Sequence, residues 1–323
     1  MDAFTLPFNF DPVRLAQDAN QLEGLSQLRQ PGPHHKGEWT GVAIRSAAGV
    51  QSTAPSFPSL EPYKFTAEAD HAPYLKSILS SLPFPLEVVR VLWLPPGGVI
   101  GTHIDFHTNF QFGLIRLHIP LRTNPDIEFV ISGRQYQMQV GELWYGDFSK
   151  PHQVTNRGSQ VRLHAVVDVE INDGLLALMP PEYVTEQAEA GPISKYRPEL
   201  DMTDDLSSFE CRFFVPGTVL PLLVLGKLTE LLSGASAKIS RADDKLVLLL
   251  NDKPNCKLIR VSDEQFLFLG LPPGCFLHLQ RSNGSVIIAE LVVRGAQEDL
   301  VSARVGVMRG KRVAERRIVF DLI

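Results

Sequence analysis

The pattern of apolar positions in the middle of the chain predicts strands rather than helices. From Glu87 to about Asp168, short runs rich in β-branched and aromatic residues are separated by Gly, Pro, Asn or Ser, which is typical of strands joined by turns. Strands at this spacing suggest a sandwich or jelly roll, a group that includes the cupin-like double-stranded β-helix. The pattern alone also allows other β folds. The predicted strands are VVRVLWL, GLIRLHIPL, IEFVI, QYQMQV, ELWYG, HQVTN and QVRLHAVVDV.

The segment before these strands contains two predicted helices that would support the β-rich part. Asp11 can cap a helix that begins at Pro12, because aspartate accepts hydrogen bonds from free backbone N–H groups and proline suits the first helical position. The other predicted elements are an extended segment over residues 4–10, a strand over residues 39–44 and a helix over residues 72–82.

The second half of the chain predicts a second domain. Residues 181–208 are polar and acidic with no clear period, which indicates a linker or a surface wrap. A helix through PGTVLPLLVLGKLTELLSG and a series of short strands follow. We therefore expect a mainly β protein: a jelly-roll domain with N-terminal helices at residues 1–180, the linker, and a C-terminal α+β domain at residues 209–323. The last domain could be structural or dimerising, or could dock a substrate or carrier protein.

Three residues among the predicted strands are candidate metal ligands. His103 and Asp105 form an H-x-D pair, and residues two apart in an extended segment point to the same side of a sheet. His152 follows several strand-and-turn units later and could fold back beside them. Two histidines and one carboxylate on one face of the metal is the arrangement of non-haem Fe(II) oxygenases. The alternative is a hydrogen-bonded histidine pair in a β core. His107 extends the motif to H-x-D-x-H, but a histidine in a nearby loop is usually solvated.

Arg162 makes the metal interpretation stronger. It lies ten residues after His152 in an alternating segment that places Arg162, His164 and Val166 on one face. An arginine that points into a protein interior is costly unless an anion pairs with it. A dicarboxylate bound to the metal would supply that anion, and the planar guanidinium suits a carboxylate. The alternative for Arg162 is a surface ion pair.

With these residues in view, the sequence resembles the aspartyl/asparaginyl beta-hydroxylase family of Fe(II)/2-oxoglutarate-dependent dioxygenases, and within it the cis-4-proline hydroxylase-like amino-acid hydroxylases. The motifs that carry the resemblance are the H-x-D, the later histidine with an arginine ten residues on, RLHIPLRTNPDIEFVISG, GELWYGDFSKPHQVTNRG and VRLHAVVD. They cover roughly the first half of the chain. The resemblance implies the jelly-roll fold.

The resemblance also implies roles for individual residues. His103, Asp105 and His152 would bind iron, and Arg162 would bind the distal carboxylate of 2-oxoglutarate. Arg116 and His118 would line the co-substrate or substrate pocket, and the alternative for them is a buried structural polar pair.

Two positions distinguish branches of the family. The name-giving beta-hydroxylase lacks the carboxylate ligand and has a serine at the position that matches Leu92, whereas this chain has Asp105. Related halogenases replace the carboxylate by a small residue that leaves room for chloride. Asp105 therefore favours an amino-acid hydroxylase.

The expected reaction is hydroxylation of an unactivated C–H bond of proline or another free amino acid, with release of succinate and CO2. Fe(II) and the co-substrate 2-oxoglutarate would be required, and ascorbate would stimulate turnover. Two alternatives stay open. The substrate could be a peptide, protein or carrier-tethered residue docked by the C-terminal domain, or the first domain could be a non-enzymatic jelly-roll binding module.

Composition excludes some partners. The net charge of -5 and the pI near 6.0 argue against nucleic-acid binding. The most apolar stretch, Val219 to Leu232, contains Lys227 and Glu230 and is too short to cross a bilayer. Three cysteines without C-x-x-C spacing are typical of reduced thiols, and the N-terminus does not read as a signal peptide. We expect a cytoplasmic enzyme with a small-molecule substrate, and a homodimer is a candidate assembly.

Overall fold

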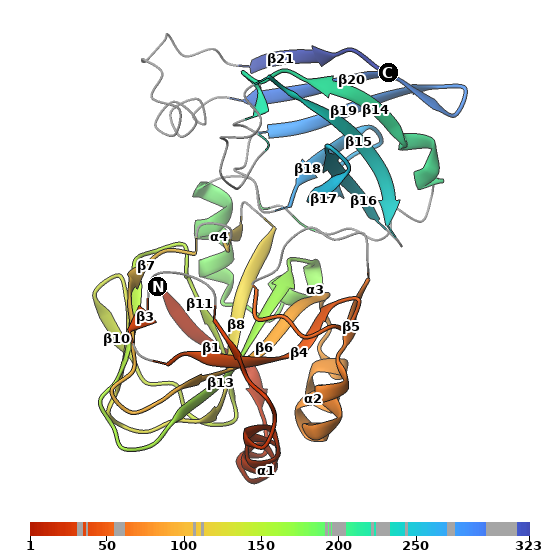
Figure 1. Ribbon diagram of the computed structural model, residues 1–323. Coiled ribbons are helices and arrows are strands. Elements are labelled where there is room, and N and C mark those ends of the chain that lie inside the picture. The colour runs from red at the N-terminus through yellow and green to blue at the C-terminus, as the bar shows by residue number, and fades with distance from the viewer. Residues whose placement is uncertain are drawn as a thin grey trace. The chain divides into compact units, whose positions relative to one another are not determined.

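Strands make up most of the described structure. The computed structural model describes residues 1–30, 35–36, 38–54, 62–105, 108–110, 113–190, 193, 195, 205–220, 223, 233–242, 245–269, 275–294 and 315–323. The chain divides into two compact units, the first formed by residues within 1–186 and the second mainly by residues 187–323. The expectation of a mainly β protein is confirmed (Figure 1).

The first unit contains two antiparallel sheets. The larger has the strand order β1-β11-β8-β13-β6-β4-β2, with β5 paired to β4, and the smaller has the order β10-β9-β12-β7-β3. The strands are β1 (Ala3–Asn9), β2 (Leu28–Arg29), β3 (His35–Lys36), β4 (Thr40–Ala47), β5 (Tyr63–Phe65), β6 (Leu86–Leu94), β7 (Val99–His103), β8 (Leu114–Arg122), β9 (Ile127–Ile131), β10 (Arg134–Tyr136), β11 (Glu142–Gly146), β12 (His152–Asn156) and β13 (Arg162–Glu170).

An apolar core joins the two sheets of this unit. Leu94 and Ala3 from the larger sheet are buried in one cluster with side chains of the smaller sheet. The smaller sheet contributes Ile100, Ile127, Phe129, Ile131 and Val154. The inward-facing side chains of the two sheets therefore meet, as in a sandwich.

Strand β13 lies at the centre of the larger sheet, between β8 and β6. All nine of its residues are buried, so burial does not distinguish the two faces of this strand. The alternation of side chains along the strand decides which of them face the smaller sheet. Its cross-strand partners on β6 include Leu94 opposite Arg162 and Leu92 opposite His164. Arg162 and His164 thus share a face, as predicted.

The helices confirm the sequence prediction at the N-terminal end. Helix α1 (Pro12–Glu23) is capped by Asp11, which accepts hydrogen bonds from the N–H groups of Val13 at 2.8 Å and Arg14 at 3.2 Å. It packs against α2 (Pro73–Ser81) and β8. The short helices of this unit are η1 (Ala67–His71) and α3 (Asp173–Leu176).

One segment differs from its prediction. Residues predicted to form a linker or a surface wrap without regular structure include helix α4 (Pro181–Ala190). Only Tyr183 of this helix is buried, and its hydroxyl lies 2.9 Å from that of Tyr145. A helix held by one buried side chain has no apolar stripe in its sequence, which is why the periodicity did not predict it.

The second unit is an antiparallel meander in which each strand pairs with the next in sequence. Phe213 on the first strand forms a bridge with Leu322, and its ring stacks on Phe320 of the last strand at 4.8 Å, so the sheet closes on itself. The elements are η3 (Leu206–Phe209), β14 (Cys211–Val215), β15 (Ala235–Ala242), β16 (Lys245–Leu250), β17 (Lys253–Arg260), β18 (Gln265–Phe268), β19 (Cys275–Ser282), β20 (Ser285–Arg294) and β21 (Glu315–Phe320).

Two predictions for the second unit lie largely or wholly outside the described residues. They are the helix over residues 216–234 and the strand VSARVGV. The α+β character of this domain and its boundaries therefore stay predictions. None of the helices in the described part of the chain combines the length and hydropathy that a membrane span requires.

Replacing Asp11 with Ala should destabilise the first unit by about 1 kcal/mol, because two N–H groups at the start of α1 lose their acceptor. Asp11→Asn keeps a capping oxygen and should lose much less. The midpoint of urea unfolding, followed by circular dichroism, measures both changes. Equal midpoints for wild type and Asp11→Ala would contradict the assignment of the cap.

Candidate active site

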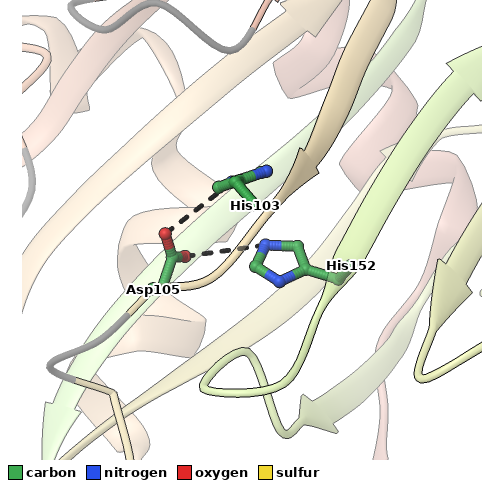
Figure 2. A group of neighbouring side chains, drawn as sticks. All are labelled: His103, Asp105 and His152. Carbon is green, nitrogen blue, oxygen red and sulfur yellow. Dashed lines mark ion pairs between the residues drawn. The ribbon is translucent and has the colours of Figure 1, made fainter.

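Two neighbouring strands of the smaller sheet bring the predicted metal ligands together. His103 at the end of β7 and His152 at the start of β12 are cross-strand partners, and their ring centroids lie 4.2 Å apart. Asp105 follows two residues after β7, where its backbone N–H donates to the Phe148 carbonyl at 2.8 Å. The three side chains converge, as predicted (Figure 2).

The spacing of these groups is typical of a metal site rather than of a hydrogen-bonded triad. Nε2 of His103 lies 3.7 Å from Oδ1 of Asp105, and Nε2 of His152 lies 3.9 Å from Oδ2. Both distances are too long for hydrogen bonds. One ligand atom from each residue nevertheless lies within 4.8 Å of the other two, and no second group of this kind occurs among the described residues.

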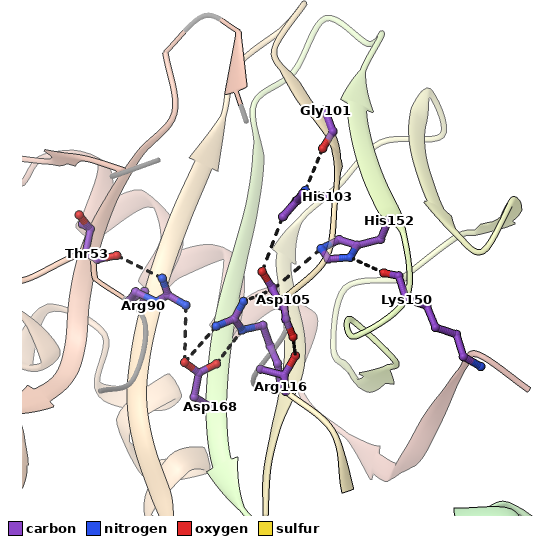
Figure 3. A network of polar contacts seen from close by, with 10 residues as sticks. Thr53, Arg90, Gly101, His103, Asp105, Arg116, Lys150, His152 and Asp168 are labelled. Atoms are coloured by element: carbon purple, nitrogen blue, oxygen red, sulfur yellow. Dashed lines mark hydrogen bonds and ion pairs between the residues drawn. The ribbon is translucent and has the colours of Figure 1, made fainter. Parts of the chain in front are cut away.

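Backbone carbonyls orient both imidazoles. Nδ1 of His103 lies 2.8 Å from the Gly101 carbonyl, and Nδ1 of His152 lies 3.0 Å from the Lys150 carbonyl (Figure 3). A carbonyl can only accept, so each Nδ1 carries the proton and each Nε2 keeps a lone pair for a metal. Burial lowers the pKa of His152, which favours the neutral form that binds metals.

The carboxylate of Asp105 is paired with an arginine. Nη1 of Arg116 donates to Oδ2 of Asp105, while Nε and Nη2 donate to the two oxygens of Asp168 at 2.7 and 3.1 Å. Burial opposes the charge on Asp105, but the positive charge of Arg116 outweighs it and holds the pKa of this carboxyl below its usual value. Asp105 is therefore ionised and able to bind a cation.

A second cluster of basic side chains lies on the inner face of the larger sheet. Nη2 of Arg162 lies 2.9 Å from Nδ1 of His164, and Nδ1 of His118 lies 3.4 Å from the same atom. All three residues are buried. Arginine can only donate, so Nδ1 of His164 accepts and its Nε2 carries the proton. Burial lowers the pKa of Arg162 to about 9 and lowers the pKa of both histidines well below the usual value.

Several polar atoms of this cluster lack a hydrogen-bond partner within the described part of the chain. They are Nε of Arg162, Nε2 of His164 and Nε2 of His118. A buried donor without a partner costs about 1–3 kcal/mol, more for a charged group. The cluster therefore has the properties of an anion site that a ligand would complete.

Phe148 connects the two clusters. Its ring stacks on His118 with centroids 4.9 Å apart and meets the edge of His152 at 5.1 Å. The guanidinium of Arg162 lies over Phe129, 5.7 Å from the ring centroid. Apolar rings thus separate the basic groups from solvent, which strengthens their attraction for an anion.

Sequence reasoning missed three residues of this arrangement. Two of them, Asp168 and Arg90, form a buried ion pair at 3.7 Å. The third, Phe148, contacts both clusters. Asp168 continues the alternation Arg162, His164, Val166 on the same face of β13, and this period was the signal that could have identified it. His107, the alternative ligand, lies outside the described residues.

Comparison with known families agrees with this geometry. Residues 14–171 match the family model described as Aspartyl/Asparaginyl beta-hydroxylase. Over these residues the chain is similar to the aspartyl/asparaginyl beta-hydroxylase family. The resemblance inferred from the sequence motifs is thereby confirmed for this part of the chain. All the site residues that were predicted for this chain lie within it.

A curated relative is similar to about half of the chain. The L-proline cis-4-hydroxylase of Rhizobium meliloti (strain 1021) is 26% identical over 164 residues, which cover 50% of this chain and 58% of that protein. The chain thus spans less than two thirds of the length of this relative.

Two solved structures similar to this chain are an oxygenase and a hydroxylase. An oxidoreductase of the 2OG-Fe(II) oxygenase family from Burkholderia pseudomallei is 15% identical, with 52% of this chain and 85% of that chain covered and a TM-score of 0.39. A prolyl-4-hydroxylase from Pseudomonas putida is 13% identical, with 52% and 92% covered and a TM-score of 0.33. These scores are too low to support an argument.

Replacing Asp105 with Ala should weaken divalent metal binding by more than the roughly 10–100-fold that loss of an outer-shell partner costs, because one of three protein ligands is removed. Titration with Co(II), followed by visible absorption, gives the dissociation constant. Asp126→Ala, at an exposed aspartate of the same unit, is the matched control and should bind like wild type. Equal affinity in Asp105→Ala would show that this cluster is not the metal site.

Proposed function

We propose that the protein is an Fe(II)/2-oxoglutarate-dependent dioxygenase that hydroxylates an unactivated C–H bond of an amino acid, proline-like or another free amino acid. The observation that carries the proposal is the convergence of His103, Asp105 and His152 at distances too long for hydrogen bonds. Two histidines and one carboxylate form the facial set of ligands that leaves three positions of Fe(II) open.

The residues present fit the metal. Two imidazole nitrogens and an ionised carboxylate are donors that suit Fe(II), and both imidazoles are held in the ligand tautomer by backbone carbonyls. A hydrogen-bonded structural triad would instead have short contacts between these groups.

The basic cluster fits the co-substrate. Arg162 and His164 are buried, and each has an N–H group without a partner among the described residues. The distal carboxylate of 2-oxoglutarate would accept from Arg162, as the family resemblance implies. This supports the prediction that Arg162 binds the co-substrate, and His118 is close enough to His164 to border the same pocket.

In this proposal the protein supplies ligands, charge and exclusion of water. His103, Asp105 and His152 would hold Fe(II), Arg162 would fix the co-substrate by its far end, and Phe148 would keep water from both. Bound Fe(II) supplies the oxygen chemistry, in which O2 and 2-oxoglutarate give succinate, CO2 and a hydroxyl group on the substrate carbon. Ascorbate would keep the metal reduced.

The sheet arrangement supports the expected jelly-roll fold. Two antiparallel sheets share one apolar core, and both contribute to the candidate site: β7 and β12 carry the histidine ligands, and β13 carries Arg162. We infer that residues 1–180 form a double-stranded β-helix with N-terminal helices, as in cupin-like proteins.

The substrate class rests on weaker support. The curated relative is named a proline cis-4-hydroxylase, and Asp105 distinguishes this chain from the family members that lack the carboxylate ligand. A free amino acid is therefore the first candidate. Homodimer formation and a cytoplasmic location stay predictions.

Succinate formation tests the proposed reaction. Purified protein with Fe(II), ascorbate and 2-oxoglutarate should form succinate faster when the correct amino acid is added, with proline tested first, and Asp105→Ala should lose this stimulation. Basal decarboxylation that no amino acid stimulates would favour a peptide, protein or carrier-tethered substrate. No decarboxylation and no iron binding would favour a binding module without enzyme activity.

Replacing Arg162 with Gln should raise the KM for 2-oxoglutarate roughly 10–100-fold, since a hydrogen bond to a charged group contributes about 1.5–3 kcal/mol. The affinity for Co(II) should change little. Arg157→Gln, at an exposed arginine paired with Glu128, is the control and should keep the wild-type KM. An unchanged KM in Arg162→Gln would remove Arg162 from the co-substrate site.

A further inference from the structure

A chain of paired charges runs from the candidate metal ligand into the larger sheet (Figure 3). Arg116 joins Asp105 to Asp168, and Asp168 also pairs with Arg90 at 3.7 Å. Arg90 in turn donates to the backbone carbonyl of Thr53 at 3.1 Å. The metal ligand is therefore connected to three strands of the sheet through consecutive polar contacts.

Arg116 and Arg162 differ in their partners. Each of the three guanidinium nitrogens of Arg116 donates to a carboxylate oxygen, whereas Nε of Arg162 has no partner among the described residues. Arg116 has its charge compensated by the protein itself. Its hydrogen bonds would have to break before it could bind an anionic ligand.

Asp168 fixes the position of Arg116. The two residues are cross-strand partners on β13 and β8, and Asp168 is completely buried. The paired contacts from Nε and Nη2 define both the position and the plane of the guanidinium. Nη1 is then directed at Asp105 by a rigid sheet rather than by a loop.

Asp105 needs such a constraint more than the histidines do. It lies outside the strands, and its side chain is 23% exposed. The histidines are held through Nδ1 by backbone carbonyls, whereas the carboxylate of Asp105 is held through Oδ2 by Arg116.

We propose that Arg116 is a positioning residue for the metal ligand Asp105, anchored by Asp168 and Arg90, and that it is not a binding residue for 2-oxoglutarate or substrate. This inference rests on the proposed function and specifies part of the same site. Because Arg116 already donates to Oδ2, Oδ1 is the oxygen of Asp105 that would be free to hold the metal.

The test separates metal affinity from co-substrate affinity. Arg116→Gln should weaken Co(II) and anaerobic Fe(II) binding by about 10–100-fold, the loss expected for an outer-shell partner, and the KM for 2-oxoglutarate at saturating Fe(II) should stay within about twofold of wild type. Arg162→Gln should show the reverse pattern. Arg157→Gln is the control for an arginine remote from the site and should change neither value.

Two further variants guard against a general loss of fold. Arg116→Lys keeps the charge but loses the planar fork, so its metal affinity should lie between those of Arg116→Gln and wild type. Asp168→Asn keeps the shape of the anchor and should weaken Co(II) binding about tenfold. Thermal unfolding and circular dichroism of the metal-free variants establish that each one is folded.

The outcomes distinguish this inference from the proposed function. If wild type binds no metal, the proposed function fails and the inference with it. If wild type binds metal and depends on Asp105, but folded Arg116→Gln or Arg116→Lys keeps wild-type metal affinity, only the inference fails. A large rise in the KM for 2-oxoglutarate with unchanged metal affinity would assign Arg116 to the co-substrate pocket instead.

Discussion

The register between β7 and β12 is the constraint on which the site depends. Because side chains alternate along a strand, a shift of one residue would move either His103 or His152 to the other face of the sheet. The pairing places these two residues opposite each other, and a register irregularity follows at once, between His152 and Val154. Irregularities of this kind often redirect side chains at functional sites.

Buried charge organises the rest of the site. The charge of Arg116 is compensated by two carboxylates of the protein, so Arg116 requires no ligand to balance its charge. In Arg162 burial lowers the pKa and leaves Nε without a partner in the described structure. In the proposed site, Arg116 positions Asp105, while Arg162 is available for an anionic co-substrate. The same residue type performs different tasks because of its neighbours on adjacent strands.

The sequence predicted the parts of the structure that short-range patterns determine. The cap at Asp11, the strand alternation that puts Arg162 beside His164, and the convergence of His103, Asp105 and His152 followed from local spacing and family motifs. Helix α4 was not predicted because only Tyr183 anchors it. The contact of Arg116 with Asp168 was not predicted either, because it depends on the register between β8 and β13, and single-sequence patterns do not determine which strands are neighbours.

The central claim is that this site binds a metal and a 2-oxo acid together. Calorimetric titration of 2-oxoglutarate into the whole chain under anaerobic conditions, with and without Fe(II), tests it most directly. If the co-substrate binds both Arg162 and the metal, its affinity should be at least about tenfold higher with Fe(II) present, equivalent to about 1.4 kcal/mol of coupling. Equal affinity with and without Fe(II), or no binding in either case, would contradict the account.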